Sequence, residues 1–452
     1  MAQEGELRAE IKEHLESISG PKGVFELFHK LNYPKEAIFD PSYIRNIKEF
    51  DFVKEEAAKI EKIYTVMSYD KLNVFLVEAK SLTRPFVRYV SKIFSNMYVR
   101  FLLILTTDYN ELQVVFPDYE KKETGKHKLK TTTLILKKEE LYYTDIQILS
   151  NIKLDEKKPT WRDLWKLWKE AFNIEKVTKN FFDDYKNVFL TIRKNLKKQK
   201  VDIKKAHEFT LQFLNRIMFI YFIAKKDWLN KDKKFMSSYW DIYKRVNKYG
   251  DDKFYVEWLR PLFFQAFNNK YKHMPKLPEE INRILSSCPF LNGGLFVENP
   301  DLDGLNITIS DALVKEIFEF FEKYNFTIKE DSILDIEVAV DPQMIGYVYE
   351  SLANVAEDAY EQEEDLRGDW GIFYTSKIEV DFMCRRSLLE YMSKHLEIPK
   401  NELYEFVFDE DKEKIEKKFN QRKCWDKIEG VLENVSVVDP ACGSGAFLVG
   451  ML

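Results

Sequence analysis

The spacing of apolar residues divides the chain into three regions, of which residues 1–155 are the first. This region opens with helical spacing and then changes to short apolar runs that are typical of strands. The expected strands are Ile63–Ser68, Leu72–Val77, Phe101–Thr106, Leu112–Phe116 and Thr131–Leu136. A helix with Phe86, Val90 and Phe94 on one face is expected between the second and third strands. This order predicts an α/β domain.

The other two regions differ in their periodicity. Residues 156–330 have helical spacing almost throughout, with aromatic residues such as Trp168 and Phe213 on the apolar stripes. We interpret these stripes as packing between helices, with a base-stacking surface as the alternative. Residues 331–452 return to a mixed pattern and end in the apolar run Val435–Val438, which is an expected strand.

Composition supports two or three folded domains. The 452 residues are about three times the usual domain length of roughly 150 residues. Apolar residues make up 45% and aromatic residues 15%, which excludes a disordered chain. The formal net charge of −5 provides no overall positive field, so contact with a nucleic acid would need a local basic patch.

One such patch lies in residues 193–205. Its basic residues are Arg193, Lys194, Lys197, Lys198, Lys200, Lys204 and Lys205. Asp202 is the only acidic residue among them. The run reads either as a solvated helix face or as a set of phosphate contacts.

The cysteines indicate a reducing compartment, and the apolar runs indicate that the chain does not span a membrane. None of the four cysteines forms a Cys-x-x-Cys pair, so the sequence offers no zinc framework. The most apolar internal stretch, Ile217–Ala224, is far shorter than the ~20 residues of a membrane span. The N-terminal residues are acidic and lack an apolar signal core. We expect a cytoplasmic protein with no membrane partner.

A glycine loop follows the apolar run at 435–438. An acid, Asp439, is followed by Pro440 and by two glycines, Gly443 and Gly445. Because glycine has no Cβ, the loop can turn sharply and approach a ligand closely. The carboxylate of Asp439 would stand at the carboxyl end of the strand, where doubly wound sheets bind nucleotide-like cofactors.

The string Asp-Pro-Ala-Cys-Gly-Ser-Gly-x-Phe-Leu resembles the S-adenosylmethionine motif of N6-adenine DNA methyltransferases. The resemblance is greatest to the large fused restriction-modification enzymes of type IIG. It implies that the acid binds the methionine part of the cofactor and that the loop wraps it. The implied cofactor-binding residues are Asp439, Pro440, Ala441, Cys442, Gly443, Ser444 and Gly445. Cys442 reads as a small packed residue, because no cationic neighbour in the sequence would lower the pKa of its thiol.

A second resemblance lies upstream, at residues 371–383. In the same family a Tyr-Thr-Pro turn begins a helix that lines the cofactor pocket, which implies binding roles for Tyr374 and Thr375. Ser376 replaces the proline here, and with Glu379 it forms a Ser-x-x-Glu capping box. The alternative is a capped helix with no further role. Residues 289–296 and 343–350 also resemble segments of these enzymes, and we expect both to be structural.

The catalytic part of such a methyltransferase is not in the sequence. Only thirteen residues follow Asp439, and the family's (Asn/Asp/Ser)-Pro-Pro-(Tyr/Phe) loop, which engages a flipped adenine, is not found. We therefore expect the front part of a longer or split protein, or a truncated gene product. Alone it should bind the cofactor weakly and transfer no methyl group.

Glu78 and Lys80 end an apolar run, and their spacing of two places both side chains on one face of a strand. With the elements that follow, the pair resembles the PD-(D/E)xK nuclease core found at the N-terminus of the same enzymes. That resemblance implies Mg²⁺ bound by Glu78 and a further carboxylate, with the lysine acting on the attacking water. Asp70 is the first candidate for this carboxylate; if residues 68–71 form a hairpin turn, Glu61 replaces it.

The sequence thus predicts an α/β plus mainly-α protein of three parts. These are a nuclease-like α/β domain (1–155), a helical connector (156–330) and the beginning of a Rossmann-like methyltransferase domain (331–452). Double-stranded DNA is the expected partner, together with a second polypeptide if the methyltransferase is split. The alternatives are a non-catalytic DNA-binding or scaffolding subunit and a stand-alone Mg²⁺-dependent nuclease.

Overall fold

The structure, a computed structural model, has two compact units, residues 1–341 and 342–452. It describes residues 2–121, 127–154, 160–291, 294–327, 335–337, 339–340, 375, 377–409, 412–440, 442 and 445–451. The expected combination of an α/β part and a mainly helical part is confirmed. The division into three domains at 155 and 330 stays a prediction.

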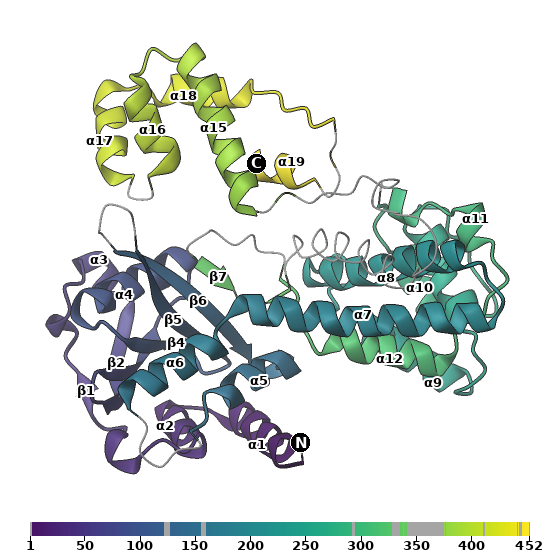
Figure 1. The fold of residues 1–452 in the computed structure, drawn as a ribbon, viewed down its shortest axis with the longest axis horizontal. Coiled ribbons are helices and arrows are strands. Elements are labelled where there is room, and N and C mark those ends of the chain that lie inside the picture. The colour runs from purple at the N-terminus through teal and green to yellow at the C-terminus, as the bar shows by residue number, and fades with distance from the viewer. Residues whose placement is uncertain are drawn as a thin grey trace, which may run out of the picture. The chain divides into compact units, whose positions relative to one another are not determined.

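The first unit contains a sheet of seven described strands, whose order across the sheet is the same as their order in the sequence (Figure 1). The strands are β1 (Ile44–Arg45), β2 (Ile60–Tyr69), β3 (Leu72–Ala79), β4 (Phe101–Thr106), β5 (Glu111–Lys121), β6 (His127–Lys137) and β7 (Asp335–Glu337). Neighbours are antiparallel except for β3 with β4 and β6 with β7, which are parallel. All five strands expected in this region are confirmed.

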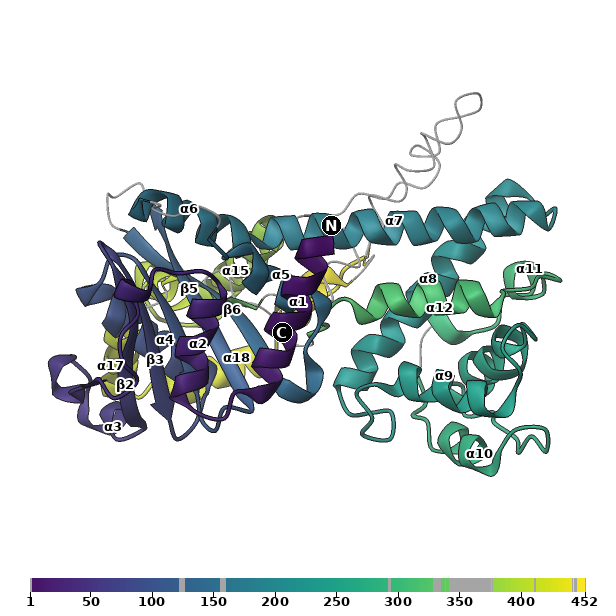
Figure 2. The ribbon, with the colours of Figure 1, turned by 90° about the horizontal axis from the view of Figure 1, so that it is seen from below.

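Helices cover both faces of the sheet. One face packs against α1 (Ala2–Ser17), α2 (Pro21–Lys30), α5 (Tyr143–Asn151) and α6 (Trp161–Ala171), as Figure 2 shows. The other face packs against α4 (Arg84–Met97), which Thr83 caps by accepting a hydrogen bond from the Phe86 amide at 3.4 Å. Phe86, Val90 and Phe94 of α4 are buried there, as their spacing predicts.

The rest of the first unit is helical. Its main elements are α7 (Ile174–Lys198), α8 (Ile203–Lys225), α9 (Phe235–Val246), the π-helical η4 (Phe254–Leu259) and η5 (Leu262–Ala266), α10 (Glu279–Ser286), α11 (Pro300–Asp303) and α12 (Asp311–Glu322). Trp168, Phe213, Trp258 and Phe263 are at most 1% exposed. The interpretation of the aromatic stripes as packing between helices is therefore confirmed for these residues.

The second unit consists of helices in its described residues. They are α15 (Lys377–His395), α16 (Lys400–Phe408), α17 (Glu413–Arg422), α18 (Trp425–Glu433) and α19 (Ala446–Met451). Leu389, Leu403 and Phe419 form its core. The strand expected at Val435–Val438 is wrong: these residues are in an extended loop without strand pairing, and Val438 is 85% exposed. A β-branched run forms a strand only where a neighbouring strand accepts its backbone hydrogen bonds.

None of the described helices combines the length and the apolar character needed to cross a membrane.

Candidate functional site

Helix α19 packs against α15 in the second unit (Figure 1), and residues 435–439 face the same helix across a pocket. The pocket is open and has a volume of about 470 Å³. Its lining residues are Met383, Cys384, Ser387, Leu388, Tyr391, Val435, Ser436, Val437, Val438, Asp439, Phe447 and Met451. The structure thus brings together the helix that follows Thr375 and the glycine motif about sixty residues later.

Specific contacts hold α15 and α19 together. The Cys384 thiol donates to the Phe447 carbonyl at 3.6 Å, and burial raises the pKa of this thiol. Gly450 permits the close approach, because a Cβ at this position would lie 3.0 Å from Val380 Cγ1 and 3.1 Å from Cys384 Sγ. On the other side of the pocket the Tyr391 hydroxyl donates to the Asn434 carbonyl at 3.3 Å.

The glycine loop leads directly into α19. Gly445 has φ = +80°, a left-handed conformation that side chains rarely adopt, and its amide donates to the Cys442 carbonyl at 2.7 Å. Cys442 is exposed, Pro440 is in a turn, and Asp439 is half-buried at the pocket. Thr375 is half-buried two residues before α15 begins. Four residues expected at the site, Tyr374, Ala441, Gly443 and Ser444, lie outside the described residues, as does Ser376 of the capping box.

The pocket has the volume and the mixed lining of a small-molecule site. Its volume is within the range of small-molecule sites, about 300–1,000 Å³. Met383, Leu388 and Phe447 supply apolar walls, and Asp439 and Ser387 supply polar groups. A carboxylate beside an apolar wall suits a ligand that carries both hydrogen-bond donors and a planar ring.

Glu78 of the first unit is at the end of β3 and is 9% exposed. Its carboxylate accepts hydrogen bonds from two phenols: the Tyr109 hydroxyl donates to Oε1, and the Tyr64 hydroxyl donates to Oε2 at 3.4 Å. The ammonium of Lys62, which is paired with Glu78 across β2 and β3, is 3.7 Å from Oε2. Both carboxylate oxygens are therefore engaged within the protein.

Burial and the Glu78 carboxylate both shift the pKa values of the side chains that contact this carboxylate. Burial, and secondly the hydrogen bond to Glu78, keeps the pKa of Tyr109 far above its usual range. Burial and the charge of Glu78 also raise the pKa of Tyr64. The same carboxylate raises the pKa of Lys62. The two phenols therefore stay protonated as donors, and the lysine stays cationic.

Tyr109 is held in place by the turn that follows β4. It has φ = +64°, and its amide donates to Thr106 Oγ1 at 2.9 Å. Thr106 Oγ1 in turn donates to the Glu111 carbonyl at 2.8 Å. Sequence reasoning did not identify Tyr64, Tyr109 or Lys62. The register of the hairpin could have indicated Tyr64 and Lys62, whereas no signal in the sequence indicates the left-handed Tyr109.

Lys80 follows β3 directly and is exposed. Its amide donates to the Lys59 carbonyl at 2.8 Å, which continues the β2–β3 pairing past Glu78. Lys80 is in a bend just beyond the end of β3, so the shared face that strand alternation predicts for Glu78 and Lys80 stays a prediction.

The two candidates for the additional carboxylate are placed differently. Asp70 is in the turn between β2 and β3, with φ = +52°, and Tyr69 pairs with Leu72 beside it. Glu78 is six strand positions beyond Leu72, which is about 20 Å along the strand, so Asp70 cannot share a metal ion with Glu78. Glu61 is at the right end of the hairpin, but it is the exposed extra residue of a bulge, and Lys62 takes the paired position.

The side chains around Glu78 do not form a binding site for a divalent metal ion. Mg²⁺ prefers oxygen ligands and is usually bound through one or two carboxylates. The oxygens of Glu78 already accept hydrogen bonds, and its close charged neighbour is a lysine. Within the ranges that the structure describes, no group of three or more His, Cys, Asp or Glu could hold a metal ion.

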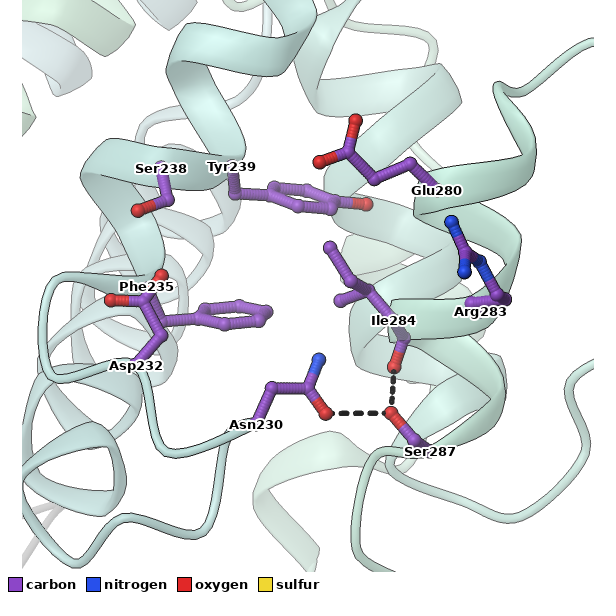
Figure 3. Close-up of a pocket in the computed structure, with 9 residues that line it drawn as sticks. All are labelled: Asn230, Asp232, Phe235, Ser238, Tyr239, Glu280, Arg283, Ile284 and Ser287. Carbon is purple, nitrogen blue, oxygen red and sulfur yellow. Dashed lines mark hydrogen bonds between the residues drawn. The ribbon is translucent and has the colours of Figure 1, made fainter.

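A separate cavity of about 510 Å³ lies among the helices of the first unit (Figure 3). It is lined by the stacked rings of Phe235 and Tyr239, whose centroids are 5.6 Å apart, and by polar residues that include Glu280 and Arg283. Ser287 Oγ donates to Asn230 Oδ1 at 2.8 Å at its edge. None of the site residues predicted from the sequence lines this cavity.

Among known proteins, the chain is similar to the "Putative type II restriction enzyme and methyltransferase RM.MjaORFECS2P" of Methanocaldococcus jannaschii. The two are 28% identical over 255 residues, which cover 54% of this chain and 20% of that protein. The match therefore spans about one fifth of the length of this relative. It relates the chain to restriction-modification proteins. No family profile and no solved structure matches the chain.

Proposed function

We propose that the chain is part of a restriction-modification protein and that residues 375–451 form part of an N6-adenine DNA methyltransferase that binds S-adenosylmethionine. The packing of α15 against α19, together with the pocket that residues 435–439 line beside α15, carries this proposal. Met383 of the upstream segment and Asp439 and Phe447 of the glycine motif line one open pocket, although the two segments are far apart in the sequence. The similarity to a protein named as a restriction enzyme and methyltransferase supports the same function.

Each element of this pocket has a role in the proposal. Asp439 accepts hydrogen bonds from donor groups of the cofactor, and the left-handed Gly445 lets the loop turn around it. Met383 and Phe447 provide apolar surface for the ring. The cofactor supplies the methyl group to an adenine of double-stranded DNA. We infer a Rossmann-like fold for this domain and the type IIG class for the whole protein.

The test is binding of S-adenosylmethionine to the full chain, measured by titration calorimetry. We expect saturable binding that Asp439→Ala weakens by at least about tenfold, since a charge-assisted hydrogen bond contributes about 1.5–3 kcal/mol. Asp426→Ala is the matched control, because Asp426 is an exposed carboxylate in the first turn of α18. Absence of binding, or equal binding by the two variants, would contradict the proposal.

An endonuclease centred on Glu78 and Lys80 is the second candidate, with a PD-(D/E)xK-like fold for residues 1–155. The name of the relative and the position of the two residues at the end of β3 favour it. Because the donors at Glu78 do not fit Mg²⁺, DNA cleavage is to be measured with and without Mg²⁺. Glu78→Gln and Lys80→Gln should abolish cleavage, and Glu55→Gln, at an exposed carboxylate, should not. Intact DNA after incubation with the unaltered chain would exclude this candidate.

A further inference from the structure

The turn between α7 and α8 concentrates positive charge on a protein of net negative charge. Residues 193–205, named here the basic turn, carry a net charge of +6, whereas the whole chain carries −5. Six lysines of the basic turn are exposed: Lys194, Lys197, Lys198, Lys200, Lys204 and Lys205. A field of one sign in a small area attracts a polyanion.

These lysines have no acidic partners among the described residues. The one acid of the turn, Asp202, is the N-cap of α8, where it accepts from the amides of Lys204 at 3.0 Å and Lys205 at 3.1 Å. Elsewhere on this surface lysines form ion pairs with acids one helical turn away, as Lys22 does with Glu26 at 3.6 Å. The lysines of the basic turn are therefore available to another molecule.

The basic turn is also well anchored. Leu196 within it and Ala206 directly after it are fully buried. The side chain of Gln199 exchanges two hydrogen bonds of 2.8 Å with the backbone of Thr308. Lys200 has φ = +63°, and its amide donates to the Lys197 carbonyl at 3.0 Å, which reverses the chain between the two helices. Figure 1 shows α7 and α8 side by side, so both contribute lysines to the same end of the helical part.

We propose that the basic turn binds the phosphate backbone of double-stranded DNA. Lysines one helical turn apart, such as Lys194 and Lys198, are about 6 Å apart along the helix axis. Each strand of a DNA duplex carries one phosphate per 3.4 Å of its axis, so neighbouring lysines can reach neighbouring phosphates. Such contacts hold DNA without reading its sequence.

An anionic membrane surface fits the basic turn less well. Binding to a lipid surface combines basic residues with a face of large apolar side chains that enters the bilayer. Within residues 193–205, which the structure describes completely, Ile203 is the one large apolar side chain classed as exposed, at 42%. The choice of DNA as the polyanion rests on the proposed restriction-modification function.

The test compares binding of the full chain and of a variant to a fluorescent 30-base-pair duplex of arbitrary sequence. The variant carries Lys194→Gln, Lys197→Gln, Lys198→Gln and Lys205→Gln, which keep most of each side chain. The control carries the same charge change at lysines that pair with acids elsewhere on the first unit: Lys12→Gln, Lys22→Gln, Lys166→Gln and Lys315→Gln. Circular dichroism checks that both variants are folded.

The expected result is a change in both affinity and salt dependence. Since each phosphate contact contributes about −0.9 to the slope of log K against log salt concentration, loss of four contacts should reduce the slope by about 3–4. Affinity at 50 mM salt should fall by at least about tenfold in the variant and by less than about threefold in the control. Equal binding by variant and control, no binding of DNA by the unaltered chain, or binding to anionic vesicles in place of DNA would overturn the proposal.

Failure of this proposal is distinguishable from failure of the proposed function. Binding of S-adenosylmethionine is measured without DNA and depends on Asp439, in the other unit. If the cofactor binds but the variant holds DNA normally, only the role of the basic turn is refuted. If the variant loses DNA binding but no cofactor binds, only the methyltransferase assignment is refuted.

Discussion

The ion pair of Arg216 and Asp303 gives the sharpest test of how the helical part of the first unit is stabilised. The two side chains are 1% and 0% exposed, and they share hydrogen bonds of 2.6 and 2.9 Å. Arg216 Nε also donates to the Leu295 carbonyl at 2.7 Å. Asp303 also accepts from the Asn299 amide at 2.9 Å. The pair thus joins α8 to α11 and the loop before it.

Asp303→Asn keeps the shape of the side chain but leaves Arg216 as an unpaired buried charge. Removing one member of a buried pair typically costs about 3–5 kcal/mol. Two charge-assisted hydrogen bonds, at about 1.5–3 kcal/mol each, give a similar magnitude. If the 341-residue unit unfolds cooperatively, a loss of about 4 kcal/mol lowers Tm by about 5–6 °C, since the unfolding entropy is about 2.1 cal/mol/K per residue.

The measurement is thermal unfolding followed by calorimetry or tryptophan fluorescence. Glu298→Gln is the matched control, because Glu298 pairs with Arg260 at 2.5 Å but the two side chains are 49% and 26% exposed. A partly exposed pair contributes at most about 1 kcal/mol. The reasoning is refuted if Asp303→Asn and Glu298→Gln change Tm by similar amounts. The double variant Arg216→Met with Asp303→Asn should cost less than the sum of its two single variants.

Three more predictions test the protonation and packing described above. Burial, and secondly Arg193, lowers the pKa of His207 to about 4, so the free energy of unfolding should be largest above pH 6.5 and fall by up to about 3 kcal/mol towards pH 4. His207→Leu should remove this part of the pH dependence, and identical pH profiles would contradict the assignment. Tyr109→Phe removes a donor to the buried Glu78 and should cost about 1.5–3 kcal/mol in urea unfolding, with no change as the contrary outcome. Gly450→Ala should cost about 1–3 kcal/mol through contact with Val380 and weaken cofactor binding, whereas Gly430→Ala, with nothing within 4 Å, should not destabilise the unit.

The regular elements were predictable where one physical signal dominated. Residues 101–106 are buried in every position, and the continuous apolar run Phe101–Thr106 predicts this strand with its correct bounds. In contrast, β7 is three residues long, and its parallel pairing with β6 joins residues about two hundred positions apart. No local pattern encodes such a contact. The run at Val435–Val438 shows the opposite error, because it has strand propensity but none of the described residues pairs with it as a strand.

The two candidate sites also differ in how far local sequence patterns predict them. The pocket beside α15 is built from segments that each carry a recognisable motif, so residues such as Asp439 could be named in advance. The surroundings of Glu78 depend on a bulge in β2 and on a left-handed tyrosine after β4. A shift of one residue decides whether Glu61 or Lys62 is opposite Glu78, and the sequence does not specify that shift.

The distribution of charge restricts how DNA would approach the first unit. Since residues 193–205 carry +6 and the chain carries −5, the remainder of the chain carries −11. Exposed charges are screened beyond about 8 Å at physiological ionic strength, so the basic turn attracts a duplex only at close range, and the acidic remainder does not strengthen that attraction. Low salt extends the range of both the attraction by the basic turn and the repulsion by the acidic remainder. DNA bound through the basic turn alone should therefore be held at one end of the α7–α8 pair, and binding should be sensitive to salt without being tight. A reading of the DNA sequence requires contacts to base edges, which lysines on phosphates do not provide.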